Sequence, residues 1–334
     1  MDTRKGTRLA PDLDELERGV LAGNRTRLAQ AITLAESRRE EDARAATELL
    51  RRLAPHTGQS LRLGISGSPG AGKSTFIDLL GQRLVKAGRR VAVLAVDPSS
   101  RVSGGSILGD KTRMGGLAQC DNAFIRPSPS GGSLGGVARR TRESLRLCEA
   151  AGFDVVIVET VGVGQSEVQV RDLTDLFLLL LLPASGDDLQ GIKRGVMELA
   201  DLVAVNKADG DTQSAALRTQ AEMAAALHMG SDGGEARLVL TCSALKGTGV
   251  AEIWSELLAL HERRRASGEL ARRRRDQEER CFRLLAEEAV LERVFHDKAL
   301  GPLRRQLEEE VSAGRLPAEA AVLRLLDGWN LRLP

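Results

Sequence analysis

The segment GSPGAGKST, residues 67–75, has residue types and a spacing that could hold phosphate groups. It matches the pattern G-x-x-x-x-G-K-[ST] and lies between an apolar run and a stretch with helical spacing. In that setting, backbone N–H groups converge on phosphate oxygens at the N-terminus of a helix. The ammonium group of Lys73 would reach the β- and γ-phosphates, and the hydroxyl of Ser74 could bind Mg²⁺. We therefore expect a nucleoside triphosphate here, held by Gly67, Ser68, Pro69, Gly70, Ala71, Gly72, Lys73, Ser74 and Thr75.

A second motif, NKAD, indicates which base this nucleotide carries. It supplies Asn206, Lys207 and Asp209 in the order N-K-x-D, in which the carboxylate accepts hydrogen bonds from N1–H and the 2-amino group of guanine. Adenine lacks this pair of donors, so it would leave the carboxylate unpaired. The stem of Lys207 would pack along the base. The downstream segment TCSALKGTG adds the loop expected against guanine O6, made of Ser243, Ala244 and Leu245.

Acidic residues between these motifs could sense the γ-phosphate. Glu159 ends an apolar run, and Gly162 follows three places later, as in the D-x-x-G switch of GTPases. The Glu159 carboxylate would hold Mg²⁺, and the N–H of Gly162 would meet the γ-phosphate. Asp97 and Asp110 could complete the metal shell, because Mg²⁺ prefers oxygen ligands. The expected magnesium ligands are Ser74, Asp97, Asp110 and Glu159.

The residue after Gly162 bears on the rate of hydrolysis. Small signalling GTPases have a water-orienting Gln at that place, whereas this chain has Val163, whose apolar side chain cannot orient water. We therefore predict slow intrinsic hydrolysis that a partner accelerates, with Gln165 as a candidate substitute.

Short apolar runs must position these motifs. From residue 61 on, LRLGIS, RVAVLAV, NAFIRP, DVVIVE, LFLLLLLP, LVAVN and RLVLTCS alternate with helical segments. Runs of this length, bounded by turns, are typical of strands covered on both faces. We predict an α/β fold with a doubly wound, mostly parallel sheet, in which ligands gather at the carboxyl ends of the strands. Residues 1–59 should form an N-terminal helical extension, residues 60–250 the nucleotide-binding domain, and residues 251–334 a C-terminal helical arm.

Composition excludes several other classes. The formal net charge of the 334 residues is +2, aromatic residues make up 2% and Tyr is absent, which argues against a nucleic-acid partner. The four cysteines form no C-x-x-C pair and the four histidines are scattered, so no metal centre beyond Mg²⁺ is expected. The apolar run at 176–183 is too short to span a membrane. A soluble, cytoplasmic protein without a membrane partner is expected.

Taken together, these motifs resemble the MeaB/ArgK/MMAA family of P-loop GTPases. GGSILGDKTRM, ETVGVGQSE and GDDLQGIKRGVMELAD carry the resemblance, together with the phosphate loop and NKAD, over residues 60–250. The resemblance implies a SIMIBI-type G domain with Asp97, Asp110 and Glu159 as switch and metal residues. It also implies that Lys193 lies in a further switch segment, and that the C-terminal helices form a homodimer.

The function implied by the resemblance is that of a G-protein chaperone of an adenosylcobalamin-dependent acyl-CoA mutase. Such a protein would gate cofactor loading and protect or rescue methylmalonyl-CoA mutase or a relative, with GTP as the timer. Two alternatives stay open, namely a GTPase that delivers a metal ion and a protein kinase of an amino-acid transport system. The chain has no His-rich tract and no kinase catalytic-loop signature, and both absences argue against these alternatives.

Overall fold

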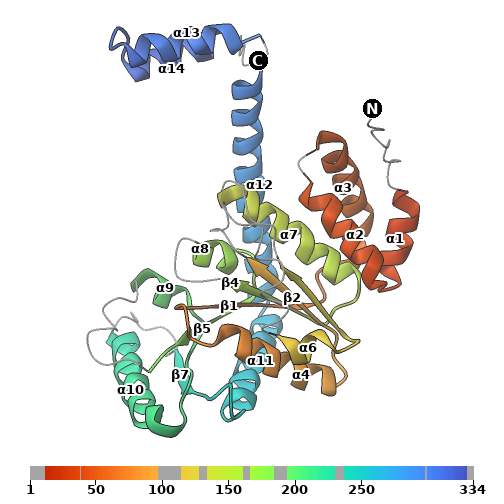
Figure 1. Ribbon diagram of the computed structural model, residues 1–334, viewed down its shortest axis with the longest axis vertical. Helices are drawn as coiled ribbons and strands as arrows, with labels where there is room; N and C mark the ends of the chain where they lie inside the picture. Colours follow the sequence, from red (N-terminus) through yellow and green to blue (C-terminus); the bar gives the residue numbers. More distant parts are fainter. Residues whose placement is uncertain are drawn as a thin grey trace, which may run out of the picture. The chain divides into compact units, whose positions relative to one another are not determined.

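A parallel β-sheet forms the centre of the structure. The computed structural model describes residues 12–37, 39–96, 114–127, 134–160, 166–183, 194–229, 237–297 and 299–328. Within these ranges, a seven-stranded sheet has the order β3-β2-β4-β1-β5-β6-β7, and all paired neighbours run parallel (Figure 1). The strands are β1 (Leu61–Gly67), β2 (Val91–Val96), β3 (Ala123–Pro127), β4 (Val155–Thr160), β5 (Leu176–Leu181), β6 (Leu202–Val205) and β7 (Leu238–Thr241). Each apolar run predicted as a strand overlaps one of them, and β1 and β4 extend one residue beyond the runs LRLGIS and DVVIVE.

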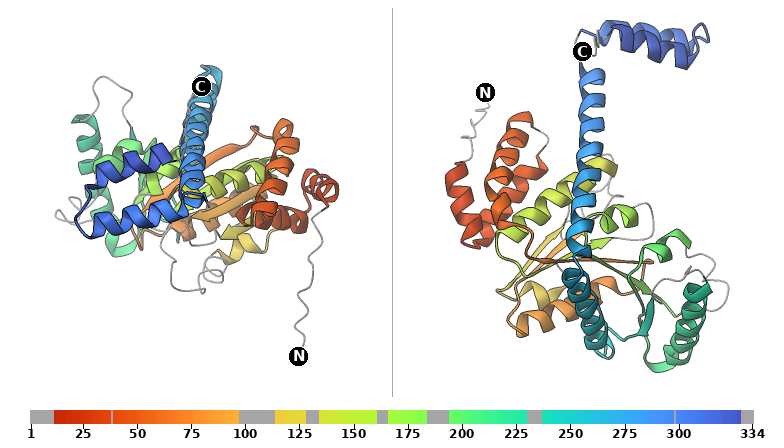
Figure 2. Two further views of the ribbon diagram at one scale, coloured as in Figure 1. Left: turned by 90° about the horizontal axis from the view of Figure 1, so that it is seen from above. Right: turned by 180° about the vertical axis from the view of Figure 1, so that it is seen from behind.

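Helices cover both faces of the sheet, which confirms the predicted doubly wound α/β class. On one face lie α4 (Lys73–Lys86), α6 (Gly115–Ala118) and α11 (Val250–Ala266). On the other lie α7 (Leu134–Ala150), α8 (Ser166–Arg171), α9 (Arg194–Leu199) and α10 (Gln213–Met229), the last preceded by the short η3 (Gly210–Thr212). Figure 2 shows the sheet between these two layers. Burial on both faces explains why β2 and β5 are apolar at every position and β4 is apolar at its first four positions.

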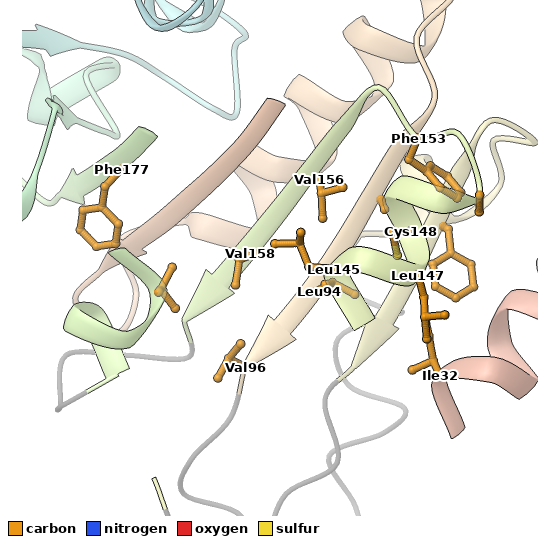
Figure 3. Close-up of a cluster of buried hydrophobic side chains, with 14 of the residues drawn as sticks. Ile32, Leu94, Val96, Leu145, Leu147, Cys148, Phe153, Val156, Val158 and Phe177 are labelled. Carbon is orange, nitrogen blue, oxygen red and sulfur yellow. The ribbon is translucent and has the colours of Figure 1, made fainter. Parts of the chain in front are cut away.

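Alternate side chains of the central strands enter two separate cores. On the α7 face, Leu94 of β2 and Val158 of β4 pack with Leu145 (Figure 3). Their neighbours Val93 and Ile157 belong to the core on the α4 face. This arrangement fixes the register of each strand, because a shift by one residue would exchange the two faces. The carboxyl ends of the strands therefore have defined positions relative to one another.

The N-terminal helices form a layer on α7. They are α1 (Leu13–Leu21), α2 (Arg25–Glu36) and α3 (Glu40–Leu53), followed by η1 (Ala54–His56). The side chains of Asp12 and Asn24 accept hydrogen bonds at the first turns of α1 and α2. Ile32 of α2 is fully buried in the core shared with α7 (Figure 3). The predicted helical character of this region is thus observed, whereas the predicted domain boundaries remain predictions.

The chain divides into two compact units, residues 1–271 and 272–334. The long helix α12 (Glu269–His296) starts at the end of the first unit, and the second unit continues with α13 (Gly301–Ser312) and α14 (Ala318–Gly328). The last two helices pack side by side, with Leu307 and Ala321 buried (Figure 2). No helix in the described part of the chain combines the length and the apolarity that a bilayer-spanning segment needs.

Candidate nucleotide-binding site

The phosphate loop connects the end of β1 to the start of α4, as predicted. A Cβ atom at Gly67 would lie 2.2 Å from the backbone oxygen of Leu180, so packing against β5 excludes any side chain there. Gly72 adopts φ +82° at the N-cap of α4 and makes no side-chain cap. The N-cap Gly72 places no side chain over the first turn of α4, and the backbone N–H groups at a helix N-terminus favour an anion.

The ammonium group of Lys73 lies inside this loop. Its Nζ donates hydrogen bonds to the carbonyl oxygens of Gly67, at 2.7 Å, and Ser68, at 3.2 Å. The Lys73 residue is only 7% exposed, so its positive charge is concentrated at the mouth of the loop. A buried cation beside the N-terminus of a helix is an arrangement that attracts phosphate.

Two of the predicted magnesium ligands lie together. The hydroxyl of Ser74 donates a hydrogen bond of 3.0 Å to Oε1 of Glu159 at the end of β4. Glu159 is 4% exposed, and its neighbour across the sheet is Ile65 of β1. A hydroxyl and a carboxylate at this separation are hard oxygen donors that suit Mg²⁺. Within the described ranges, no group of three or more His, Cys, Asp or Glu side chains could hold a metal ion.

Several predicted switch residues lie outside the described residues. They are Asp97, Asp110, Gly162, Gln165 and Lys193. Their roles therefore stay predictions.

The side chain of Asn206 connects the phosphate loop to the loop that follows β7. Its Nδ2 donates to the carbonyl oxygen of Ala71 at 2.7 Å, and its Oδ1 accepts from the N–H of Ala244 at 2.9 Å. Asn206 is 2% exposed. These contacts place the two loops at a fixed separation, so Asn206 braces the site.

The predicted base-reading residues also come together. The hydroxyl of Ser243 donates a hydrogen bond to Oδ2 of Asp209, and the same hydroxyl accepts the N–H of Lys246 at 3.0 Å. Leu245 is 82% exposed beside them. Lys207 is exposed and adopts φ +60°, a left-handed conformation that is uncommon for residues other than glycine. The arrangement presents a carboxylate of fixed orientation next to an exposed apolar side chain, which suits a purine edge.

Sequence reasoning missed three residues of this site. Thr160 donates a hydrogen bond of 2.8 Å to the hydroxyl of Ser66, and both side chains are fully buried. This bond holds the ends of β1 and β4 together immediately before the phosphate loop and after Glu159. The only signal in the sequence is a hydroxyl residue at the end of each apolar run.

Cys242 is the third missed residue. Its Sγ lies 3.5 Å from Oδ1 of Asn206, and burial raises the pKa of the thiol to about 12. The thiol therefore stays protonated at neutral pH and can donate to Asn206.

Comparison with known proteins identifies the family. The family model of the methylmalonyl-CoA mutase-associated GTPase MeaB matches residues 28–299. The GTPase ArgK of Escherichia coli (strain K12) is 49% identical over 297 residues, which cover 88% of this chain and 89% of that protein. The mitochondrial methylmalonic aciduria type A homolog of Mus musculus is 47% identical over 329 residues, which cover 94% of this chain and 79% of that protein.

A solved structure supports the same assignment. The crystal structure of an LAO/AO transport system kinase superposes with a TM-score of 0.74 at 40% identity, and the match covers 94% of this chain and 96% of that chain. The predicted fold class and the resemblance inferred from the motifs are thereby confirmed. The chain is a P-loop GTPase, and it belongs to the family of methylmalonyl-CoA mutase-associated GTPases MeaB.

Proposed function

We propose that this GTPase gates the loading of adenosylcobalamin onto an acyl-CoA mutase and protects or rescues that mutase. Methylmalonyl-CoA mutase or a relative is the proposed client. The proposal is supported by the family match over residues 28–299, because that family is described as associated with methylmalonyl-CoA mutase. GTP hydrolysis would set the time for which the client is held in one state. The cytoplasmic location and the absence of nucleic-acid and membrane partners stay predictions.

The proposed nucleotide site consists of the loops described above. The phosphate loop Gly67–Thr75 would hold the phosphates, Asp209 would read guanine, and Ser243, Ala244 and Leu245 would line the base. Mg²⁺ would be held by Ser74 and Glu159, together with Asp97 and Asp110, and would neutralise charge on the phosphates. The Ser74–Glu159 hydrogen bond supports this donor set.

The switch elements would report hydrolysis to the client. Glu159 and Gly162 would sense the γ-phosphate, and Lys193 would lie in the segment that couples the nucleotide to the mutase. With Val163 after Gly162, a catalytic contribution from the client is expected to accelerate hydrolysis.

The second unit would provide the proposed homodimer contact. It exposes large apolar side chains at Phe282, Leu284, Val290, Leu291 and Phe295 of α12 and at Val322, Leu323 and Leu326 of α14. These exposed apolar side chains support a site of protein association on this unit. A second copy of the chain is the proposed occupant, and light scattering of the purified protein would measure its mass.

The decisive experiment measures GTP turnover by the purified protein alone and with each candidate mutase. We expect the GTPase alone to turn over GTP slowly. One candidate mutase should bind the GTPase and clearly accelerate its GTP turnover. If no mutase binds the protein or changes its GTP turnover, the proposed chaperone role is rejected, whereas the assignment as a GTPase still holds. Labelled γ-phosphate on an acceptor other than water would favour a kinase, and stoichiometric Ni²⁺ or Zn²⁺ binding would favour metal delivery.

GTP should also outcompete ATP strongly for the nucleotide site, and equal affinities for GTP and ATP would contradict guanine recognition by NKAD.

A further inference from the structure

A single arginine on α4 contacts the loop that would read the base. Arg83 donates a hydrogen bond from Nη2 to the carbonyl oxygen of Gly247 at 2.7 Å. The two residues are 164 positions apart in the sequence, and their contact is partly buried. Helix α4 is itself fixed, because Phe76, Ile77 and Leu80 are buried in the core.

The loop from Ser243 to Gly249 is tightly folded around this contact. The N–H of Gly247 donates to the carbonyl of Ser243 at 2.7 Å, and the N–H of Ser243 donates to the carbonyl of Thr248 at 3.0 Å. Gly247 and Gly249 have φ values of +79° and +75°. A Cβ at Gly247 would lie 2.9 Å from Nη2 of Arg83, so the glycine also gives the guanidinium room to approach.

This loop in turn positions the side chain of Ser243, which donates to the Asp209 carboxylate. An unbroken series of hydrogen bonds therefore runs from Arg83 through Gly247 and Ser243 to Asp209. A carboxylate has about four lone-pair sites, so Asp209 can accept from Ser243 and still accept two hydrogen bonds from guanine.

We propose that Arg83 is a positioning residue for guanine selectivity, which acts by holding the loop that orients Asp209. The inference rests on the proposed role of Asp209 as the guanine reader. Arg83 lies ten residues beyond Lys73 on the same helix, about 15 Å along its axis at 1.5 Å per residue, so it does not contact the phosphates. Arg83 therefore influences how the protein binds the base and not how it binds the phosphate groups.

A comparison of guanosine and inosine nucleotides separates base recognition from phosphate binding. The phosphates are the same, whereas hypoxanthine, the base of inosine, lacks the 2-amino group of guanine. With GDP, both N1–H and the 2-amino group donate to Asp209, so binding requires the correct carboxylate orientation. With IDP, only N1–H donates. Loss of the Arg83 contact should thus weaken GDP binding more than IDP binding.

The test measures dissociation constants of GDP and IDP for the full-length protein with Mg²⁺, by competition against a fluorescent guanine nucleotide. Arg83→Met keeps the apolar stem and removes the donor, and it should lower the preference for GDP over IDP by about 3- to 10-fold. Arg83→Lys, which keeps a donor, should restore part of that preference. Lys86→Met, at an exposed position of the same helix, should leave it unchanged.

Thermal unfolding of each variant distinguishes positioning from a purely structural role. A structural role predicts a lower Tm with equal losses for GDP and IDP, and that result would overturn the inference, as would an unchanged preference in Arg83→Met. Arg83→Gln, whose side chain is too short to reach the carbonyl, is made in parallel, so the comparison does not depend on one variant folding.

Asp209→Asn separates failure of the inference from failure of the proposed base site. If this substitution abolishes the preference for GDP over IDP while Arg83→Met retains it, only the role of Arg83 is wrong. If Asp209→Asn retains the wild-type preference, Asp209 does not read guanine and the inference fails with it.

Discussion

The hydroxyl of Ser74 and the carboxylate of Glu159 are joined by a hydrogen bond of 3.0 Å, although 85 positions separate them in the chain. Ser74 is in the first turn of α4 and Glu159 is near the end of β4. β4 and β1 are adjacent parallel strands, so their carboxyl ends meet at the same edge of the sheet. The contact brings together a hydroxyl and a carboxylate at the place where the nucleotide phosphates are proposed to bind.

Replacement of Glu159 by Gln should impair the use of Mg²⁺. The amide keeps the size of the side chain but removes the negative charge that attracts the cation. We expect GTP hydrolysis to fall by at least about tenfold and half-maximal activity to need more Mg²⁺. Turnover measured over a range of MgCl₂ concentrations tests this. Glu222→Gln, at an exposed position on α10, is the matched control, and an unchanged Mg²⁺ dependence in Glu159→Gln would exclude Glu159 from the metal site.

Replacement of Lys73 by Ala should abolish tight triphosphate binding. The ammonium group donates to the loop carbonyls of Gly67 and Ser68, and it is placed to exchange these acceptors for phosphate oxygens. Loss of a charged hydrogen bond costs about 1.5–3 kcal/mol, or roughly 10- to 100-fold in affinity. Titration calorimetry with a non-hydrolysable GTP analogue measures this loss. Lys86→Ala is the control, and retention of wild-type affinity by Lys73→Ala would contradict the proposed role of the loop.

Replacement of Asn206 by Ala should weaken the whole nucleotide site. The carbonyl of Ala71 and the N–H of Ala244 would both lose their partner, at about 1–3 kcal/mol for each group left unsatisfied. We expect a lower Tm and weaker GDP binding together. Asn24→Ala removes only the cap of α2, so it should lower Tm without changing GDP affinity. Equal GDP affinity in Asn206→Ala and the wild type would show that the hydrogen bonds of Asn206 to the two loops are not needed for binding.

The positions of the motifs could be predicted because each one follows an apolar run. Gly67 and Asn206 lie at the ends of β1 and β6, where the runs LRLGIS and LVAVN placed them. The hydrogen bond between Ser66 and Thr160 could not be predicted, because it depends on which strands are neighbours. The sheet order places β4 beside β1, and nothing local in the sequence specifies that pairing.

The contact between Arg83 and Gly247 was unpredictable for a different reason. The acceptor is a backbone carbonyl, which every residue has, so no residue type marks it. The motif N-K-x-D predicted that Asn206 belongs to the nucleotide site. It did not predict that the buried amide of Asn206 contacts the backbone of Ala71 and Ala244. Pattern reasoning thus located the site, and tertiary packing determined which side chains hold its loops.

The four cysteines should differ sharply in reactivity. Cys148 and Cys242 are buried, whereas Cys120 and Cys281 are partly exposed. Burial raises the pKa of both buried thiols, to about 12 for Cys242, and the thiolate is the form that attacks a disulfide reagent. With an aromatic disulfide reagent at pH 8, we expect Cys120 and Cys281 to react in the native protein and Cys148 and Cys242 only on unfolding. The variants Cys120→Ser and Cys281→Ser assign the native reactions.

The same burial predicts how stability depends on alkaline pH. The Cys242 thiol has an ordinary pKa of 9.0, which rises to about 12 in the folded protein, so the folded state holds this proton when the unfolded state has lost it. The resulting stabilisation is fully present below pH 9.0 and is lost as pH rises from there toward about 12. Urea unfolding at pH 8 and at pH 10 measures the free energy of unfolding. Its decrease with pH should reach roughly 1.4 kcal/mol per pH unit for each such thiol. Cys242→Ser removes one of these titrations and should reduce the pH dependence. Rapid native labelling of Cys242, or an unchanged pH dependence in Cys242→Ser, would contradict a protonated thiol buried beside Asn206.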